Sequence, residues 1–424
     1  MTAATPGRAQ VLAALPGVLA HHAPELDAAI VTERGYPVAS VRRDREGLLA
    51  DAARAASVPD PAAGRAPLTG RDGGDGGDRY LLCILSYNIG YWALVPVLNC
   101  VLPGNHVRLR FPRGADRIAA VMLAVLHDLV GPDRVVVDDR PGRELAHAAA
   151  EDPGCTGVCL YGSDRAGWGF RGAAEAGAVV VVEGPGNDPA LVLPDAAPDV
   201  AARLTAMKYA YGSGQACVAP ERILVARSRY AEVVDGLAAA AAELVVGDPA
   251  DPRVDVGPIL HTAVLARLRE QLDDAVAHGA QVVTGELGAD GSARPTVVAG
   301  LTPAMRAMTE EVFGPVVYVA PVEDDDEAVD LAAASPMGLS ASVWGRRDAE
   351  AVAARLRGAP ALEQVDAPVT GRFGLVSVNR PGTANSLHVP FGGYGRSGWV
   401  WRPEPGGPPT FWQGPKHLGR VFSR

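Results

Sequence analysis

The sequence predicts an α/β fold built on parallel sheets, and three observations support this prediction. Short apolar runs alternate with helical patterns from Tyr80 onward. Strands separated by helices in this way are typical of parallel sheets, because the chain must cross over between neighbouring strands. The chain has 424 residues, 48% hydrophobic and 21% charged, so it can bury a large core and divide into two or three domains.

The expected elements follow from apolar spacing along the chain. Residues 8–58 place apolar side chains at helical intervals, as in Leu48, Leu49, Ala52, Ala53 and Ala56, and we expect helices there. Residues 59–79 are too rich in Gly, Pro and Asp for regular structure and predict a loop. We expect strands within 80–85, 106–111, 134–139, 157–162, 178–184, 222–226, 280–285, 316–322, 340–345 and 375–379, with helices at 89–102, 116–130 and 348–357.

Composition and charge exclude several kinds of partner. The formal charge of -10 repels a phosphate backbone, so we expect no nucleic acid. No run approaches the roughly 18 apolar residues that cross a bilayer, and the N-terminus shows no secretory signal. The five cysteines are sparse and odd in number, which favours free thiols. We expect a soluble cytoplasmic protein without a membrane partner, and no metal site.

The local sequence around two residues, Cys217 and Glu183, makes them candidates for a chemical role. Cys217 lies in "GSGQACVAPERILV"; taken alone, it predicts a buried structural thiol, because free cysteine behaves as a small hydrophobe. Glu183 follows four consecutive valines at the end of a buried strand, where a carboxylate is costly without a partner or a task. Strand ends that face loops are the usual place for a working acid in α/β proteins.

Four motifs in order make a more specific pattern. GQAC ends at Cys217 and is followed by EEVFGP at 310–315, VN at 378–379 and PFGGYGRSG at 390–398, with Glu183 ahead of them all. This pattern resembles the aldehyde dehydrogenase superfamily, and the likeness runs from about residue 20 to the end. The resemblance implies a doubly wound Rossmann-type cofactor domain at 1–184, an α/β catalytic domain at 185–400, and a tail at 401–424 that packs on a partner or on the chain's own sheet.

The resemblance also implies roles for single residues. It makes Cys217 the nucleophile, Glu183 the general base and Asn88 a donor to the oxyanion. It assigns nicotinamide cofactor binding to Arg110, Arg113, Gly162, Ser163, Gly167, Glu311 and Phe313. It assigns substrate binding to Tyr91, Trp92, Arg380, His388 and Phe391, where the bulk of Tyr91 and Trp92 favours a short substrate.

The sequence departs from the family pattern at several places. Gly184-Pro185-Gly186 stands where the family has Leu-Gly-Gly, and Gly212 replaces an asparagine before the nucleophile. Several tens of N-terminal residues are missing, and residues 71–79 stand where an oligomerising hairpin is usual. We therefore expect a reduced oligomerisation element and a homodimer, with a monomer as the next choice.

The implied reaction is NAD(P)-dependent oxidation of a small polar or anionic aldehyde to a carboxylic acid. A cysteine thiolate adds to the aldehyde, hydride leaves the thiohemiacetal, and Glu183 helps water to hydrolyse the thioester. Two alternatives stay open: an acylating aldehyde dehydrogenase or acyl thioester reductase, and a catalytically silent structural relative. Glu183 favours hydrolysis, because acylating members commonly lack this glutamate.

The choice between NAD and NADP depends on Arg113. NAD-preferring relatives often carry a glutamate there, and an arginine can bind a 2′-phosphate through its planar fork. We expect NADP to be preferred by about ten-fold to a hundred-fold, from a contact of about 1.5–3 kcal/mol. Comparing kcat/KM for both cofactors in the wild type and in Arg113→Glu tests this; a wild type that prefers NAD, or an unchanged ratio, contradicts it.

Overall fold

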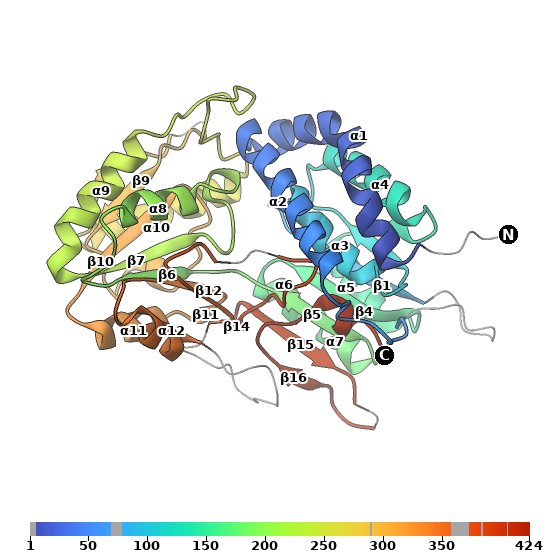
Figure 1. Cartoon of the computed structure of the whole chain (residues 1–424). Helices are drawn as coiled ribbons and strands as arrows, with labels where there is room; N and C mark the ends of the chain where they lie inside the picture. The colour runs from blue at the N-terminus through green and yellow to red at the C-terminus, as the bar shows by residue number, and fades with distance from the viewer. Residues whose placement is uncertain (1–5, 69–78, 289–290, 358–372, 383–384, 405) are drawn as a thin grey trace.

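The computed structural model consists of two α/β halves that lie side by side (Figure 1). It describes residues 6–68, 79–288, 291–357, 373–382, 385–404 and 406–424. The helices span Arg8–Arg34 (α1), Val38–Ser57 (α2), Leu94–Val101 (α3), Asp116–Val130 (α4), Gly142–Glu151 (α5), Asp164–Trp168 (α6), Arg171–Glu175 (α7), Val200–Lys208 (α8), Tyr230–Ala242 (α9), Thr262–Ala277 (α10), Asp325–Ala333 (α11), Ala349–Leu356 (α12) and Leu418–Val421 (α13). The first half carries the long N-terminal helices and the short C-terminal helix α13, and the second half carries helices α8 to α12.

The first half is built on a seven-stranded sheet in the order β16-β15-β5-β4-β1-β2-β3. Its five strands from β5 to β3 are parallel, whereas β15 is antiparallel to β5 and to β16. The strands are Tyr80–Ile84 (β1), Val107–Arg110 (β2), Val135–Val137 (β3), Cys155–Tyr161 (β4), Val179–Glu183 (β5), Gly398–Arg402 (β15) and Thr410–Trp412 (β16). Apolar clusters cover both faces of this sheet, which explains the continuous apolar run that ends at Glu183.

A second seven-stranded sheet, in the order β13-β12-β6-β7-β10-β9-β8, forms the other half. All pairs are parallel except β8 with β9. The strands are Asp188–Val192 (β6), Pro220–Ala226 (β7), Gln281–Thr284 (β8), Thr296–Ala299 (β9), Val316–Val322 (β10), Ser340–Trp344 (β12) and Leu375–Val378 (β13). One face packs on α8 and α9 and the other on α10, α11 and α12.

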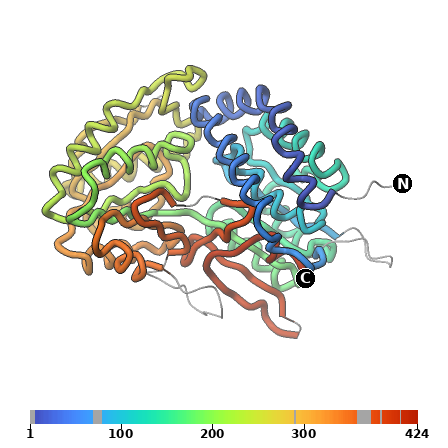
Figure 2. The backbone as a smooth tube through the Cα atoms, in the orientation of Figure 1, coloured from blue at the N-terminus to red at the C-terminus, as the bar shows by residue number. Residues whose placement is uncertain are grey.

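The chain returns from the second half to the first near its C-terminus. Met337–Gly338 (β11) pairs with Tyr394–Gly395 (β14), and the next strand, β15, then joins the first sheet beside β5. In that register Gly398 lies opposite Glu183. Figure 2 shows the C-terminus in the same half as the N-terminal helices, and backbone hydrogen bonds between Arg424 and Ala66 attach it there. The tail therefore packs on the sheet that carries Glu183.

The expected α/β fold and parallel sheets are confirmed. A strand overlaps each of the ten ranges that the apolar runs predicted, with β4 and β7 each starting two residues earlier than predicted, and helices occupy most of 8–57. The strands that were not expected are β6, β9, β11, β14, β15 and β16. Strand β6 contains Pro189, and a proline argues against a central strand. The structure accommodates this proline beside a register shift between Asp188 and Pro189. The shortened hairpin expected at 71–79 lies outside the described residues except for Arg79.

Three of the cysteines meet in the core of the first sheet. Cys83 on β1, Cys100 on α3 and Cys159 on β4 are fully buried, and their sulfur atoms lie within 4.8 Å of one another. All described cysteines are free thiols, as their number indicated. Among the described residues, no helix combines the length and the apolar character that a membrane crossing needs.

Candidate active site

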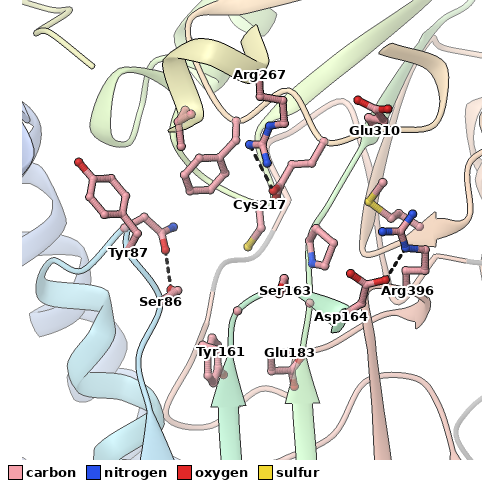
Figure 3. A pocket seen from close by; sticks show the side chains of 18 of the residues that line it. Ser86, Tyr87, Tyr161, Ser163, Asp164, Glu183, Cys217, Arg267, Glu310 and Arg396 are labelled. Carbon is pink, nitrogen blue, oxygen red and sulfur yellow. Dashed lines mark hydrogen bonds and ion pairs between the residues drawn. The ribbon is translucent and has the colours of Figure 1, made fainter. Parts of the chain in front are cut away.

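Cys217 lies where two cavities meet. The larger cavity has a volume of about 630 Å³ and the smaller one about 120 Å³. Residues that line both are Ser86, Asn88, Tyr161 and Cys217. Figure 3 shows the Cys217 side chain in the space between Tyr87 and the strand ends that carry Tyr161 and Glu183. A group bound to this sulfur is therefore open to one cavity on each side.

The loop before Cys217 has an unusual backbone. Gly212, Ser213 and Gly214 have φ values of 46°, 57° and 83°, all in the left-handed region. At Gly212 a Cβ would also lie 2.7 Å from the Tyr36 ring. Glycine adopts such a backbone without steric cost, and the Tyr36 ring leaves no room for a side chain at position 212. Ser213 is held there by its hydroxyl, which accepts a hydrogen bond from Gly257 N at 2.9 Å.

The Gly184-Pro185-Gly186 segment lets three stretches of chain approach one another closely. A Cβ at Gly186 would lie 1.8 Å from the carbonyl oxygen of Cys217, and a Cβ at Gly184 would lie 2.3 Å from the carbonyl oxygen of Arg396. Only glycine fits at such distances. These glycines therefore fix the loop that carries Cys217 and the 390–398 motif against the end of β5.

Asn88 is held with its side-chain amide toward the Cys217 loop. Its Nδ2 donates to the carbonyl of Gln215 at 3.2 Å, and its Oδ1 accepts from the Ser86 hydroxyl at 2.6 Å. Its own carbonyl accepts from the Tyr211 hydroxyl at 2.6 Å. An asparagine amide carries two N–H groups, so one is left for a bound oxygen beside the thiol.

Glu183 is buried and paired with a lysine from the C-terminal tail. Its Oε1 lies 2.7 Å from Lys416 Nζ, and the two side chains are 3% and 1% exposed. Burial raises the pKa of Glu183 to about 7, because the loss of water outweighs the opposing charge of the Lys416 ammonium. The carboxyl group therefore changes charge near neutral pH, in the range that a general base needs.

The pKa of the Cys217 thiol is also shifted upward. Burial raises its pKa well above the usual value, and the charges of Glu311, Asp188 and Glu183 raise it further. These surroundings therefore favour the protonated thiol over the thiolate. A positive charge bound beside the sulfur would favour the thiolate, which is the reactive form.

The strand-to-helix turn after β4 forms one wall of the larger cavity. Gly162 and Ser163 line it, but Gly167 does not. The Gly162 N–H donates to the Glu183 carbonyl at 3.0 Å, and the Ser163 hydroxyl accepts from Ala166 N at 3.2 Å as the cap of α6. Gly167 lets α6 pack on the sheet, since a Cβ there would lie 2.6 Å from a methyl of Val182.

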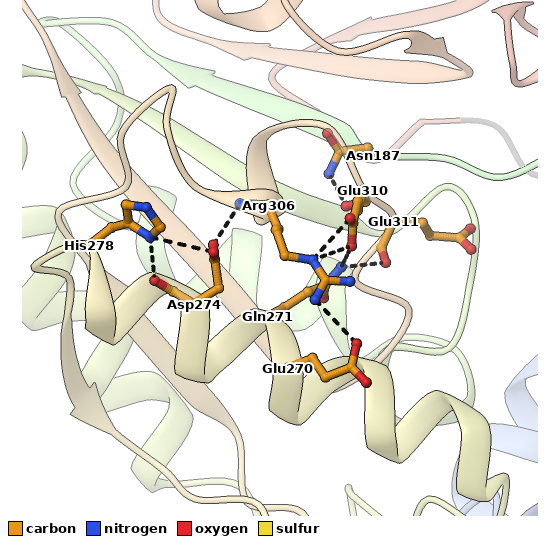
Figure 4. A network of polar contacts seen from close by, with 8 residues as sticks. All are labelled: Asn187, Glu270, Gln271, Asp274, His278, Arg306, Glu310 and Glu311. Atoms are coloured by element: carbon orange, nitrogen blue, oxygen red, sulfur yellow. Dashed lines mark hydrogen bonds and ion pairs between the residues drawn. The ribbon is translucent and has the colours of Figure 1, made fainter.

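Glu311 and Phe313 also line the larger cavity, on a loop fixed by a polar network (Figure 4). Glu311 Oε1 accepts from Gly186 N at 3.0 Å, which ties this loop to the segment after Glu183. Glu310 pairs with Arg306 at 3.0 Å, and Gln271 Nε2 donates to the Glu311 carbonyl at 3.1 Å. Glu311 is therefore presented to the cavity by a rigid support.

The other assigned residues divide between the smaller cavity and the rest of the protein. Trp92 and Phe391 line the smaller cavity. The residues that line neither cavity are Arg110, Arg113, Tyr91, Arg380 and His388. Tyr91 donates to Asp27 at 2.6 Å, and His388 lies 3.2 Å from Asp51. Both of these side chains therefore bind within the protein rather than facing the thiol.

The structure adds two arginines, Arg267 and Arg396, that the sequence did not single out. Arg267 and Arg396 line the larger cavity, where Arg267 lies 3.9 Å from Glu311 and Arg396 lies 2.6 Å from Asp164. Asn385 lines the smaller cavity and accepts from the Tyr161 hydroxyl at 3.0 Å. Arg396 lies inside the PFGGYGRSG motif, so its place in the sequence gave a signal; Arg267 lies on α10 without any motif.

The structure is that of an α/β protein with two sheets and a cysteine thiol that lines two adjoining cavities. The chain belongs to the aldehyde dehydrogenase family, whose sequence model matches residues 2–404. It is 37% identical to a succinate-semialdehyde dehydrogenase [NADP(+)] of Deinococcus radiodurans over 302 residues, which are 70% of this chain and 60% of that relative. It is 30% identical to a succinate-semialdehyde dehydrogenase [NADP(+)] 1 of Mycobacterium bovis over 325 residues, which are 75% of this chain and 68% of that relative.

The fold is shared with solved structures of the family. A crystal structure of a mutant aldehyde dehydrogenase C from Pseudomonas syringae, complexed with NAD+ and octanal, is similar with a TM-score of 0.79 and 27% identity. That likeness covers 98% of this chain and 83% of the other chain. The chain thus matches about three fifths of the Deinococcus relative's length and most of the Pseudomonas structure.

The close contact at Gly186 generates a stability test. We expect Gly186→Ala to lose about 1–3 kcal/mol of stability, because the added methyl overlaps the Cys217 carbonyl oxygen. Gly17→Ala is the matched control, since its Cβ meets nothing within 4 Å inside α1. Thermal unfolding of both variants measures the difference. A Gly186→Ala protein as stable as the wild type would show that the contact is not restrictive.

Proposed function

We propose that this protein oxidises small aldehydes to carboxylic acids with NAD(P), using Cys217 as the nucleophile. The observation that carries the proposal is the position of the thiol between a large and a small cavity. A cofactor in the large cavity and an aldehyde in the small one would meet at this sulfur. Membership of the aldehyde dehydrogenase family and the NADP(+) in the relatives' names support the same reaction.

The residues around the larger cavity suit a nicotinamide cofactor. Gly162 and Ser163 stand at its strand-to-helix turn, and Glu311 and Phe313 stand on the loop opposite. We assign the nicotinamide ribose and ring to Glu311 and Phe313. When bound, NAD(P) supplies a hydride acceptor. NADP is our first choice, because the exposed guanidinium of Arg113, three residues after β2, could bind the 2′-phosphate. Among the described residues, no carboxylate is paired with Arg113.

Cys217 acts first. The thiolate adds to the carbonyl carbon of the aldehyde, and the oxygen gains the negative charge. The free N–H of Asn88 and the Cys217 backbone N–H donate to this oxygen and lower the barrier by about 3 kcal/mol. Because burial raises the pKa of Cys217 well above its usual value, a cation bound nearby would favour the reactive thiolate.

Glu183 acts on the thioester that remains after hydride transfer. Its carboxylate removes a proton from the attacking water, whose oxygen bonds to the acyl carbon. The bond between this carbon and the Cys217 sulfur then breaks, and the product leaves as a carboxylic acid. Glu183 lines the larger cavity, and its charge contributes to the raised pKa of Cys217, which supports its nearness to the sulfur. Its presence favours hydrolysis over acyl transfer to another thiol.

The smaller cavity limits the substrate. Its volume of about 120 Å³ suits a short aldehyde, and Trp92 and Phe391 wall it. The side-chain N–H groups of Asn385 offer hydrogen bonds to a polar or anionic tail, whereas the Tyr211 hydroxyl already donates its proton to the Asn88 carbonyl. Succinate semialdehyde, named in two relatives, is the first aldehyde to test. For the assembly, a homodimer stays our prediction.

Removing the nucleophile should abolish the reaction. We expect Cys217→Ala to lose more than about a thousand-fold in aldehyde oxidation, because no other described thiol lines either cavity. Cofactor affinity should change less than about three-fold. Absorbance of the reduced nicotinamide with a panel of short aldehydes measures the first, and equilibrium titration measures the second. Substantial turnover by the variant would rule out Cys217 as the nucleophile.

Removing the base should separate the two chemical phases. We expect Glu183→Gln to retain a rapid burst of reduced cofactor and to slow the steady state by about a hundred-fold or more, because only hydrolysis needs the carboxylate. Stopped-flow absorbance resolves the burst from the steady state. Equal slowing of both phases would place Glu183 elsewhere in the mechanism.

A further inference from the structure

The partner of the proposed base comes from the C-terminal tail, beyond the last residue that the family's sequence model matches. Lys416 Nζ lies 2.7 Å from Glu183 Oε1, and the family match ends at residue 404. Both side chains are almost fully buried. A buried lysine without a carboxylate is expensive, so its presence at this place calls for a physical reason.

The tail is attached so that Lys416 reaches the carboxylate. Lys416 forms a two-hydrogen-bond bridge with the Phe391 backbone, with N–O distances of 2.8 and 2.9 Å. Gln413 Nε2 donates to the Gly395 carbonyl at 2.8 Å. Gly392 leaves room for the ion pair, because a Cβ there would lie 2.5 Å from Lys416 Nζ. The 390–398 motif and the tail together therefore build the position of the ammonium.

Lys416 is the one cation that faces Glu183 among the described residues. The other titratable groups that interact with the carboxylate are Cys159 and Tyr161 on β4 and Cys217 on the nucleophile loop. None of these three carries a positive charge in any protonation state. Without Lys416, burial would keep Glu183 protonated, and a protonated carboxyl cannot accept a proton from water.

We propose that Lys416 is a positioning residue that holds Glu183 as an ionised carboxylate at the wall of the thiol cavity, so that thioester hydrolysis proceeds at neutral pH. The inference rests on the proposed function. It assigns the tail a part in the second half-reaction and none in the first. The proton balance is simple: water gives a proton to the Glu183 carboxylate, and hydroxide oxygen forms the new bond to the acyl carbon as the sulfur leaves.

The test compares Lys416→Met with Lys416→Arg in stopped-flow assays across pH. We expect Lys416→Met to keep the burst and to lower the steady-state rate at pH 7 at least ten-fold. The steady-state rate increases with pH, and the pH at the midpoint of this increase should move upward by one unit or more. The direction follows because loss of the ammonium raises the pKa of the base, and the base works only when ionised. Lys416→Arg should restore part of the rate and most of the midpoint.

Thr410→Val is the matched control, because it removes the hydrogen bond from the Thr410 hydroxyl to the Arg402 carbonyl and keeps the contacts that hold Lys416. Its pH midpoint should stay at the wild-type value. A Lys416→Met enzyme with the wild-type midpoint, or with both phases slowed equally, or with a faster steady state, would overturn the inference.

A stability measurement separates this inference from the proposed function. If the wild type oxidises no aldehyde, the proposed function fails, and thermal unfolding still tests the pair. We expect Lys416→Met alone to lower Tm at pH 8, and Glu183→Gln added to it to recover part of the loss, because the double variant buries no unpaired charge. A double variant whose losses simply add would show that the two side chains are not coupled.

Discussion

The contact between Gly186 and the Cys217 carbonyl oxygen is the constraint on which the site depends. It is possible only because position 186 has no side chain. Through it the end of β5, which carries Glu183, touches the loop that carries the thiol, and Glu311 adds a hydrogen bond to Gly186 N from the far side of the cavity. Three segments distant in sequence are thereby fixed within one cleft, at the edge where the two sheets approach each other.

Charge is the second constraint. Glu183 is buried and Cys217 is half-buried between two cavities, and desolvation raises the pKa of each. A protonated thiol is a weak nucleophile and a protonated carboxyl group cannot act as a base, so both need a nearby positive charge that favours the ionised form. The structure supplies a cation for Glu183 through Lys416, and the proposed mechanism leaves the thiol to be ionised by a bound cation. This division allows the two residues to act in different steps.

Much of the fold was predictable because strands buried on both faces read as apolar runs, as in the stretch before Glu183. The motifs also brought attention to Cys217, Asn88 and Glu311, which the structure places on the larger cavity. The departures at Gly184, Gly186 and Gly212 could be seen but not explained, because their reason is a close approach between distant segments. Lys416 escaped notice, since a single lysine in an irregular tail has no periodicity or motif, and its partner is 233 positions away in the chain.

The central claim is that Cys217 carries the acyl group between the two half-reactions. Intact-mass measurement of Glu183→Gln after mixing with NADP+ and succinate semialdehyde tests it most directly, with peptide mapping of residues 211–222. We predict a single acyl adduct on Cys217 that accumulates with the burst and decays slowly. Reduced cofactor formed without an adduct, or an adduct on another cysteine, would contradict this role of Cys217.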